Sequence, residues 1–173
     1  VRVDLNVPLV DGIITERSRI KIIKKTIQKL KRQKNKIFLL SHFGRPKGKI
    51  NKKYSLKFIC NILEEELDLK KLLFLNNLEK KTIQKAINKM NPGDVCLFEN
   101  VRFYPQEEKN DLKFCKNLCK NFDLFVNDAF SASHRKHASI VGIPKYLPSF
   151  PGEGLKNEIN KINFFIKNPK KTN

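Results

Sequence analysis

The sequence lacks the long apolar stretch that a membrane span requires, since none of its uninterrupted hydrophobic runs approaches about 20 residues. It also lacks a secretory signal peptide and an initiating methionine, because it opens on Val1-Arg2-Val3-Asp4. We therefore expect a soluble protein of the cytoplasm, and a piece that begins after the natural start of its gene product. A hydrophobic content of 40% excludes a disordered basic tail, because this composition can bury a core.

Acidic residues are scarce. The 173 residues include 17 Asp and Glu against 36 Lys and Arg, which gives a formal charge of +19. Such a charge allows a basic nucleic-acid-binding domain, because phosphate neutralisation dominates that kind of binding. The lysines are dispersed through every segment, however, whereas a nucleic-acid module concentrates charge on one face and interleaves aromatic residues. We favour a solvated surface and keep nucleic-acid binding as the alternative.

Cysteine motifs and phosphate-binding glycine loops are also missing. The four cysteines form no CxxC pair. Cys115 and Cys119 would share one face of a helix, but two thiols cannot complete a tetrahedral zinc site. We interpret all four as small apolar core residues in a reducing compartment. Neither GxxxxGK(S/T) nor GxGxxG after a strand occurs, so no nucleotide site is expected in this chain.

Short apolar runs alternate with helical periodicity along most of the chain. We expect strands over residues 1–5, 37–40, 72–75, 95–98 and 124–126. Apolar residues at three- and four-residue steps predict helices over 20–30, 56–67, 83–90, 112–119 and 155–166. Thr15 and Ser55 are expected to cap the first two helices.

Strands that alternate with helices predict βαβ units with right-handed crossovers. The expected fold class is therefore α/β: a doubly wound, Rossmann-like parallel sheet with helices on both faces, in three layers. We expect residues 1–151 to form this domain and residues 152–173 to begin a helix leading to a second domain. Gly152 and Gly154 precede that helix, where a hinge and an ordinary turn are equally compatible with the sequence.

Ligands of open parallel sheets bind outside the carboxyl ends of the strands, so the residues after each strand are candidates for a site. Asp4 and Asn6 follow the first expected strand, and His42 and Arg45 follow the second. The later strands are followed by Glu99, Asn100 and Arg102, and by Asn127, Asp128 and the segment from Ser133 to His137 that contains Arg135. Arg19 lies early in the first helix and is expected to reach the same rim.

Several guanidinium groups at one rim would repel each other unless an anion fills the space between them. Arginine matches phosphate and carboxylate in a two-pronged geometry that lysine lacks. The sequence thus predicts a small ligand with several negative charges and a hydroxyl group, such as a sugar-acid phosphate. The alternative is that each arginine pairs with a nearby acidic residue. We interpret Glu99, Asp128 and His137 as hydrogen-bonding support for the arginines, and His134 as structural.

Five motifs resemble those of phosphoglycerate kinases. Residues 2–8 (RVDLNVP) resemble the family's opening, 41–48 (SHFGRPKG) its SHxGRPxG loop, and 99–110 its ENxRFxxxEExN segment. Residues 126–130 (VNDAF) and 134–139 (HRKHAS) resemble the two halves of VNDAFxxxHRxHAS. The motifs follow in the family's order over essentially the whole chain, which is therefore identified as a member of the family.

The resemblance implies a glycolytic kinase of two α/β domains that transfers a phosphoryl group between 1,3-bisphosphoglycerate and ADP, giving 3-phosphoglycerate and ATP. The family's amino-terminal domain binds the phosphoglycerate, and its carboxyl-terminal domain binds ADP or ATP with Mg²⁺. This chain matches only the first domain, so it is expected to bind 3-phosphoglycerate weakly and to be inactive alone. Its expected partner is its own carboxyl-terminal domain in a monomer, with no nucleic acid and no membrane.

The family's site residues carry over by motif. Arg19 would be catalytic, because its charge would neutralise the transferring phosphoryl group in the transition state. Asp4 and Asn6 would bind the hydroxyl and carboxylate region of the glycerate. The carboxylate and the other phosphate would be held by His42, Arg45, Arg102 and Arg135. The complete expected substrate-binding set is Asp4, Leu5, Asn6, Arg19, His42, Phe43, Gly44, Arg45, Arg102 and Arg135, with no metal ligand in this chain.

Two segments depart from the family pattern. Ser131-Ala132-Ser133 replaces the usual Gly-Thr/Ala-Ala run before His134, a change that we expect to be tolerated. Residues 149–154 differ from the family's apolar lead into the last helix. Gly152 and Gly154 fall where the family enters its interdomain helix, and domain closure there would exclude water from the substrates.

Overall fold

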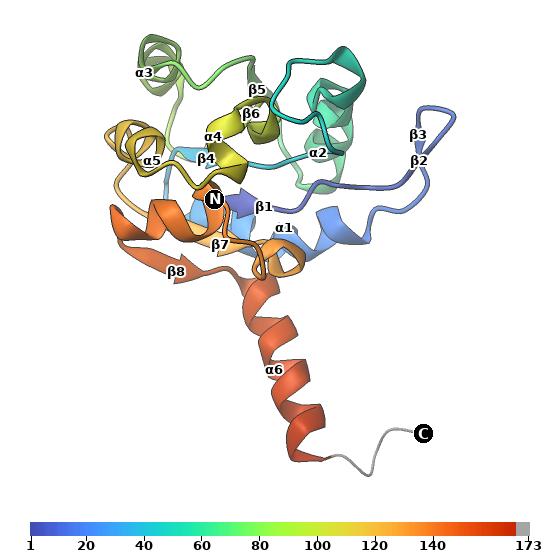
Figure 1. Cartoon of the computed structure of the whole chain (residues 1–173). Coiled ribbons are helices and arrows are strands. Elements are labelled where there is room, and N and C mark those ends of the chain that lie inside the picture. Colours follow the sequence, from blue (N-terminus) through green and yellow to red (C-terminus); the bar gives the residue numbers. More distant parts are fainter. Residues whose placement is uncertain (169–173) are drawn as a thin grey trace.

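Parallel strands form the centre of the molecule in the computed structural model, which describes residues 1–168 (Figure 1). One three-stranded sheet contains β1 (Arg2–Val3), β7 (Phe125–Asp128) and β8 (Ser149–Pro151), in that order. The other contains β4 (Ile37–Leu39), β6 (Val95–Phe98) and β5 (Leu72–Leu75). A parallel bridge between Arg2 and Leu40 joins them, so the strand order is β5-β6-β4-β1-β7-β8.

The central strands are buried on both faces, because successive strand residues point to opposite sides of a sheet. In β4, Ile37 and Leu39 enter one hydrophobic cluster, whereas Phe38 enters the other. The four residues of β6 divide between the clusters in the same way. This burial explains why the strands read as continuous apolar runs rather than as alternating ones.

Helices cover both faces of the sheet. The apolar sides of α1 (Ser18–Arg32) and α2 (Cys60–Glu66) pack in the first cluster. Those of α3 (Lys80–Lys89) and α5 (Leu112–Cys119) pack in the second. The remaining helices are α4 (Pro105–Glu108) and α6 (Glu153–Lys167), and short turns include η1 (Lys52–Tyr54), η2 (Lys57–Ile59), η3 (Val101–Phe103), η4 (Phe130–Ala132), η5 (Ala138–Gly142) and η6 (Ile143–Lys145). The predicted three-layer α/β fold is confirmed.

The prediction that Thr15 caps the first helix is wrong. Residues before this helix form a hairpin of β2 (Leu9–Val10) and β3 (Ile13–Ile14), whose turn places Asp11 and Gly12 at positive φ. The Thr15 N–H donates to the Pro8 carbonyl at 3.2 Å and so extends the hairpin. Helix α1 therefore begins later, with Arg17 at its N-cap and no side-chain cap.

The other predicted elements are present, with shifted ends. The prediction that Ser55 caps the second helix is wrong, because the N-cap positions are Leu56 for η2 and Ile59 for α2, both without a side-chain cap. Ser55 Oγ instead accepts from the Lys57 N–H at 3.2 Å in the turn before α2. The opening strand is shorter than expected, and the strand predicted over 124–126 extends instead over 125–128. Strand β8 was not predicted from the sequence.

The prediction that the cysteines are core residues is confirmed for three of them. Cys96, Cys115 and Cys119 are buried and free, and Cys60 is free and half-buried at the edge of the first cluster. Burial raises the pKa of the Cys96 and Cys115 thiols to about 12, so both stay protonated at neutral pH.

Helix α6 leaves the body of the molecule and projects away from it (Figure 1). Its start is fixed by Asp128 at the end of β7, whose Oδ1 accepts from the Leu155 N–H at 2.8 Å. A Cβ at Gly152 would lie 2.3 Å from Asp128 Cγ, and one at Gly154 would lie 2.4 Å from Ile22 Cγ2. This close packing accounts for the small residue at both positions.

No helix among residues 1–168 is long and apolar enough to cross a membrane. The last residues of the predicted tail, 169–173, lie outside the described part of the chain.

Candidate functional site

The loops that follow β1, β4, β6 and β7 meet at the carboxyl edge of the sheet. Because β1 lies between β4 and β7, the first loop is central to this rim. The segment after β1 contains Asp4 to Asn6, and the segment after β4 contains His42 to Arg45. Arg102 lies in η3 after β6, and Arg135 follows η4 after β7. The sequence prediction thus identified segments that the fold brings to one edge.

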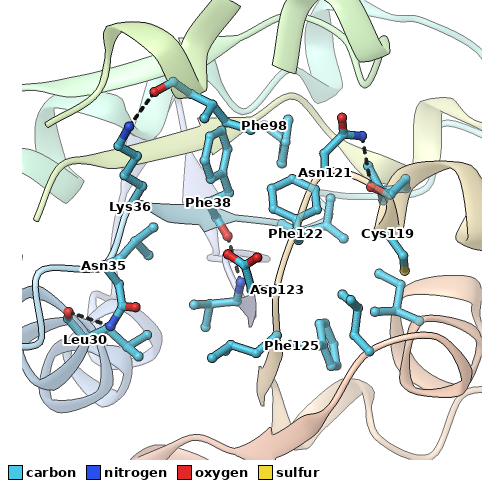
Figure 2. A pocket seen from close by; sticks show the side chains of 18 residues that line it. Leu30, Asn35, Lys36, Phe38, Phe98, Cys119, Asn121, Phe122, Asp123 and Phe125 are labelled. Carbon is cyan, nitrogen blue, oxygen red and sulfur yellow. Dashed lines mark hydrogen bonds between the residues drawn. The ribbon is translucent and has the colours of Figure 1, made fainter. Parts of the chain in front are cut away.

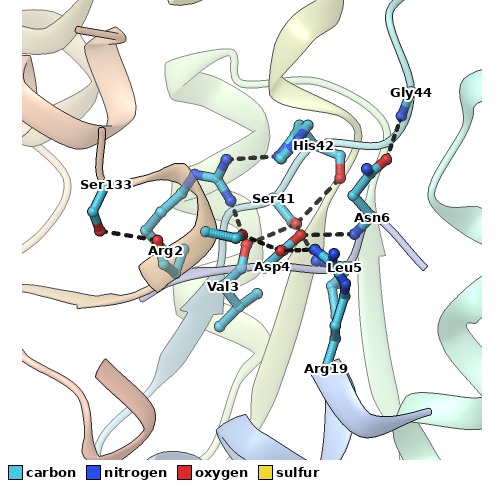
Figure 3. Close-up of polar contacts among 12 residues, drawn as sticks. Arg2, Val3, Asp4, Leu5, Asn6, Arg19, Ser41, His42, Gly44 and Ser133 are labelled. Carbon is cyan, nitrogen blue, oxygen red and sulfur yellow. Dashed lines mark hydrogen bonds and ion pairs between the residues drawn. The ribbon is translucent and has the colours of Figure 1, made fainter. Parts of the chain in front are cut away.

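Asp4 organises the central loop through both carboxylate oxygens (Figure 3). Oδ1 accepts from the Asn6 N–H at 3.0 Å. Oδ2 accepts from the Arg19 guanidinium and from the Ser131 hydroxyl. The Asp4 side chain is 11% exposed and that of Arg19 is 38% exposed, so the pair lies at the surface of the rim.

Backbone and side-chain contacts tie the central loop to its neighbour (Figure 3). Asn6 Oδ1 accepts from the Gly44 N–H at 2.8 Å, and the Leu5 N–H donates to Ser41 Oγ at 3.0 Å. The Leu5 side chain is completely buried in the first cluster. Gly44 has a φ of 59°, and a Cβ there would lie 2.4 Å from the Tyr54 ring. Only glycine therefore fits this position.

His42 is a buried, neutral imidazole. Its Nδ1 lies 2.8 Å from Arg2 Nη2, and because a guanidinium only donates, Nδ1 is the acceptor. Burial is the main cause that lowers the pKa of His42 to about 2, and the charges of Arg2, Arg102 and Arg135 lower it further. The proton of the neutral ring therefore sits on Nε2, which is left as a hydrogen-bond donor.

Arg2 was not recognised as a site residue from the sequence, although it holds His42. It is only 1% exposed, and its Nε donates to Ser139 Oγ at 3.0 Å. Ser139 in turn donates its hydroxyl to Glu107 Oε1 at 2.6 Å and its N–H to Glu107 Oε2 at 2.8 Å. We call Arg2, Ser139 and Glu107 the inner network. The one signal in the sequence was an arginine inside an otherwise buried strand.

Arg102 and Asn100 build the wall beside the β4 loop. Asn100 Nδ2 donates to the carbonyls of Phe43 at 2.7 Å and Tyr54 at 2.9 Å, and Arg102 Nη1 donates to the Gly44 carbonyl at 2.8 Å. Arg102 is 4% exposed, and its Nε lies 3.5 Å from Glu108 Oε1. Within residues 1–168 this Nε has no hydrogen-bond partner.

The charges of the rim arginines act on one another. Burial lowers the pKa of Arg102, and the positive charges of Arg135 and Arg45 lower it further against the opposing charge of Glu108. Arg45 is exposed and Arg135 is half-buried. In the described part of the chain, neither of these two side chains forms an ion pair or a hydrogen bond. The alternative that every arginine pairs with an acidic residue is therefore wrong for Arg45 and Arg135.

The expected supporting role of Glu99 and Asp128 is also wrong. Glu99 accepts from the Ser55 hydroxyl at 2.6 Å and from the Leu56 N–H at 2.7 Å, so it holds the start of η2. Asp128 holds the start of α6. Both carboxylates are used on backbone near the rim, because loop ends leave N–H groups that need acceptors. His137 lies 3.7 Å from Glu107, and His134 is exposed.

A separate apolar cavity of about 190 Å³ lies at the opposite edge, where β4 and β7 begin (Figure 2). The rings of Phe38, Phe98 and Phe122 line it, with centroids 5.2 to 6.3 Å apart. The polar side chains of Asn35 and Asn121 there donate to backbone carbonyls of the chain itself. Lys36 and the Val1 amino group also line this cavity, but they donate to the carbonyls of Ile87 at 2.8 Å and Phe38 at 2.7 Å, and no arginine among residues 1–168 lines it. The carboxyl edge therefore remains the candidate site.

Comparisons with known proteins agree with this geometry. The family model for phosphoglycerate kinase matches residues 1–173. Phosphoglycerate kinase of Coprothermobacter proteolyticus is 45% identical over 172 residues, which are 99% of this chain and 44% of that protein. The enzyme of Borreliella burgdorferi is 46% identical over 171 residues, again 99% of this chain and 43% of the relative.

Solved structures give the same result. The structure of phosphoglycerate kinase from Coxiella burnetii superposes with a TM-score of 0.83 at 35% identity, covering 98% of this chain and 42% of that one. The Pyrococcus horikoshii enzyme gives a TM-score of 0.81 at 30% identity, covering 92% and 40%. The chain thus spans less than half the length of these relatives. A rim of convergent arginines, the fold and both comparisons lead to one conclusion: this chain belongs to the phosphoglycerate kinase family.

Proposed function

We propose that this chain forms the phosphoglycerate-binding half of a phosphoglycerate kinase. The reaction is reversible phosphoryl transfer between 1,3-bisphosphoglycerate and ADP, giving 3-phosphoglycerate and ATP. The observation that carries the proposal is the rim formed by Arg45, Arg102 and Arg135. These charges act on each other, two of them have no acidic partner among residues 1–168, and the buried Nε of Arg102 has no acceptor there. An anion with several oxygens would satisfy all three.

The neutral state of His42 suits the same ligand. A protonated imidazole would add a charge that Arg2, Arg102 and Arg135 already oppose. The neutral ring instead offers its Nε2–H as a directional donor, fixed by the bond from Arg2 to Nδ1. In this proposal Nε2–H and the rim arginines bind the carboxylate and the phosphate that is not transferred.

Arg19 and the central loop form the part of the site nearest the transferring group. Arg19 is proposed as the catalytic residue, because its fixed charge would neutralise the equatorial oxygens as the phosphoryl group moves. Its side chain is 38% exposed and rests on Asp4, so it is available to a bound anion. Asp4 and Asn6 would bind the glycerate hydroxyl and carboxylate region. The backbone around Leu5, Phe43 and Gly44 would frame the ligand.

We propose that residues 1–151 are the substrate domain and that residues 152–173 begin the connection to a carboxyl-terminal domain. The outer part of α6 supports this, since it projects from the body (Figure 1) and leaves Phe164, Phe165 and Ile166 from 50% to 72% exposed. Such a run of exposed apolar side chains is typical of a surface that another part of a protein covers. The relatives are about twice as long as this chain, and their additional length is sufficient for a second domain.

We propose that ADP or ATP binds with Mg²⁺ on that carboxyl-terminal domain. Residues 1–168 contain no group of three His, Cys, Asp or Glu side chains placed to hold a metal ion, and we assign no metal ligand to them. When bound, Mg²⁺ would neutralise charge on the nucleotide phosphates. We further propose a cytoplasmic protein, in keeping with four free cysteines, and a monomer.

The proposal is tested in the full-length gene product with 3-phosphoglycerate and ATP as substrates. We expect Arg135→Ala to lower kcat/KM for 3-phosphoglycerate by about 10- to 100-fold, the range for losing hydrogen bonds to a charged group. Lys89→Ala is the matched control, because Lys89 is exposed at the end of α3, just before β6 begins and thus at the opposite edge.

Two results would contradict the proposal. One is an Arg135→Ala variant as active as the wild type. The other is salt-dependent DNA binding by a protein that does not respond to 3-phosphoglycerate, which would favour the nucleic-acid alternative, an alternative with no support from the comparisons. A direct binding test is available for the chain as it stands: amide signals near Arg45 and Arg135 should shift at millimolar 3-phosphoglycerate, and unchanged signals would refute the site.

A further inference from the structure

We propose that Ser131 is a positioning residue for phosphoryl transfer, acting through Asp4 on Arg19. This inference rests on the proposed function. Ser131 belongs to η4, the turn that follows β7, and it stands where the family pattern has glycine. From the sequence alone this difference was expected only to be tolerated. The structure gives its side chain a specific contact, because the Ser131 hydroxyl donates to Asp4 Oδ2.

With this contact, the Asp4 carboxylate is held by donors from three segments of the chain instead of two. Asp4 Oδ1 is fixed by the N–H of Asn6 in its own loop, and Oδ2 receives Arg19 from α1. Without Ser131, the only side chain bonded to Oδ2 would be that of Arg19, which is long and 38% exposed. Movement of Arg19 would then also move the Asp4 carboxylate. Ser131 is a short side chain on a different element, so it limits rotation of the carboxylate.

The hydroxyl also changes how strongly Asp4 holds Arg19. Two donors on the same carboxylate oxygen carry like partial charges and repel each other, so each is held less strongly than it would be alone. Arg19 therefore remains ion-paired with Asp4 in a fixed direction, yet is more easily drawn to a phosphoryl group. A cavity of about 240 Å³ lined by Asp4, Arg19, Phe130 and Ser131 gives the guanidinium space to move.

The same turn contains a matched serine that lacks this contact. Ser133 Oγ donates to the Ala129 carbonyl at 3.0 Å and lies 3.4 Å from Asn127 Nδ2. Its hydroxyl serves the turn itself. Ser131→Ala and Ser133→Ala thus remove the same atom two residues apart, and only the first removes a donor from Asp4.

The test uses steady-state kinetics of the full-length gene product with 3-phosphoglycerate and ATP. For Ser131→Ala we expect kcat to fall about 3- to 10-fold, because one hydrogen bond to a partly exposed charged group is lost. KM for ATP and the urea midpoint of unfolding should not change. Ser131→Thr, which keeps the hydroxyl, should retain activity, and Ser133→Ala should keep the wild-type kcat.

A double-mutant cycle identifies the route of the effect. In an Asp4→Ala background, Ser131→Ala should cause no further loss, because the oxygen that accepts its hydrogen bond is absent. The inference is overturned if Ser131→Ala has wild-type kcat, or if it lowers kcat equally in both backgrounds. If the wild-type protein itself lacks phosphoglycerate kinase activity, the proposed function fails and this inference fails with it; an active wild type with an unaffected Ser131→Ala variant overturns the inference alone.

Discussion

The arginines at the carboxyl edge differ in whether an acidic residue of the chain offsets their charge. Arg2, in the inner network, is 1% exposed and is linked through Ser139 to the fully buried Glu107. Arg45 and Arg135, at the outer rim, have no acidic partner among residues 1–168. A buried charge without a partner is strongly destabilising, and the carboxylate of Glu107 offsets the charge of Arg2. The charge of an exposed arginine is solvated by water, so it needs no acidic partner and is available to bind an anionic ligand.

Arginine thus has two roles at this edge: a structural one in the inner network and a proposed ligand-binding one at the outer rim. The inner network fixes the orientation and protonation state of His42, and thereby prepares one donor of the site. The outer rim supplies charge that the fold itself does not need. Variants of the inner network should therefore lose stability, and variants of the rim should lose binding with little change in stability.

The largest effect on stability is expected for Glu107→Gln. It removes the charge that offsets Arg2, and it turns an amide donor toward Ser139, which already donates twice to this side chain. We expect the free energy of unfolding to fall by about 3 kcal/mol, the lower end for breaking a buried pair. Urea denaturation measures it. A loss within experimental error would show that Arg2 does not depend on this carboxylate.

An intermediate effect is expected from pH through His42. Its pKa is about 2 in the folded protein against an ordinary value of 6.5, so below pH 6.5 the unfolded chain binds a proton that the folded one does not. Its contribution to stability is therefore complete above pH 6.5 and is lost as the pH falls toward 2, by about 1.4 kcal/mol per pH unit, which amounts to about 2 kcal/mol between pH 7 and pH 5.

His42→Asn isolates this contribution, because the amide oxygen can still accept from Arg2 but does not titrate. Between pH 7 and pH 5, the variant should lose less stability than the wild type in urea denaturation. Parallel pH dependences of the two proteins would show that another group causes the loss in acid.

The smallest effect on stability is expected for Arg45→Ala at the outer rim. Because the side chain is exposed and has no acidic partner among the described residues, the free energy of unfolding should change by no more than about 0.5 kcal/mol. Removing a like charge near Arg102 favours the folded state slightly. A large destabilisation would place Arg45 with the inner network and would remove the distinction drawn above.

Much of the fold could be predicted because its signals are local. Runs such as Ile37–Leu39 are apolar on both faces, and the helices repeat at three and four residues, so the order of elements and the parallel sheet follow from the sequence. The start of α1 could not be predicted, because a capping residue was assigned where hairpin pairing with Pro8 extends to Thr15. Pairing between segments overrides a local preference.

The site shows the same division. The rim segments were found from the rule that ligands lie at the carboxyl ends of strands. The acidic side chains at these strand ends were assigned to the arginines, but Glu99 and Asp128 hold backbone N–H groups instead. Glu107, to which no role was assigned from the sequence, is the carboxylate linked to Arg2 through Ser139.

The sequence by itself determined the α/β class, the family motifs and the arginines that reach the rim, since each depends on residue type and on spacing along the chain. The tertiary structure decided which arginine is buried and which is left without an acidic partner in the described residues. It also decided that His42 stays neutral and that Ser131 bonds Asp4 across 127 positions of the chain. The physical reason is that desolvation and charge pairing depend on distances between segments, which the order of residues does not specify.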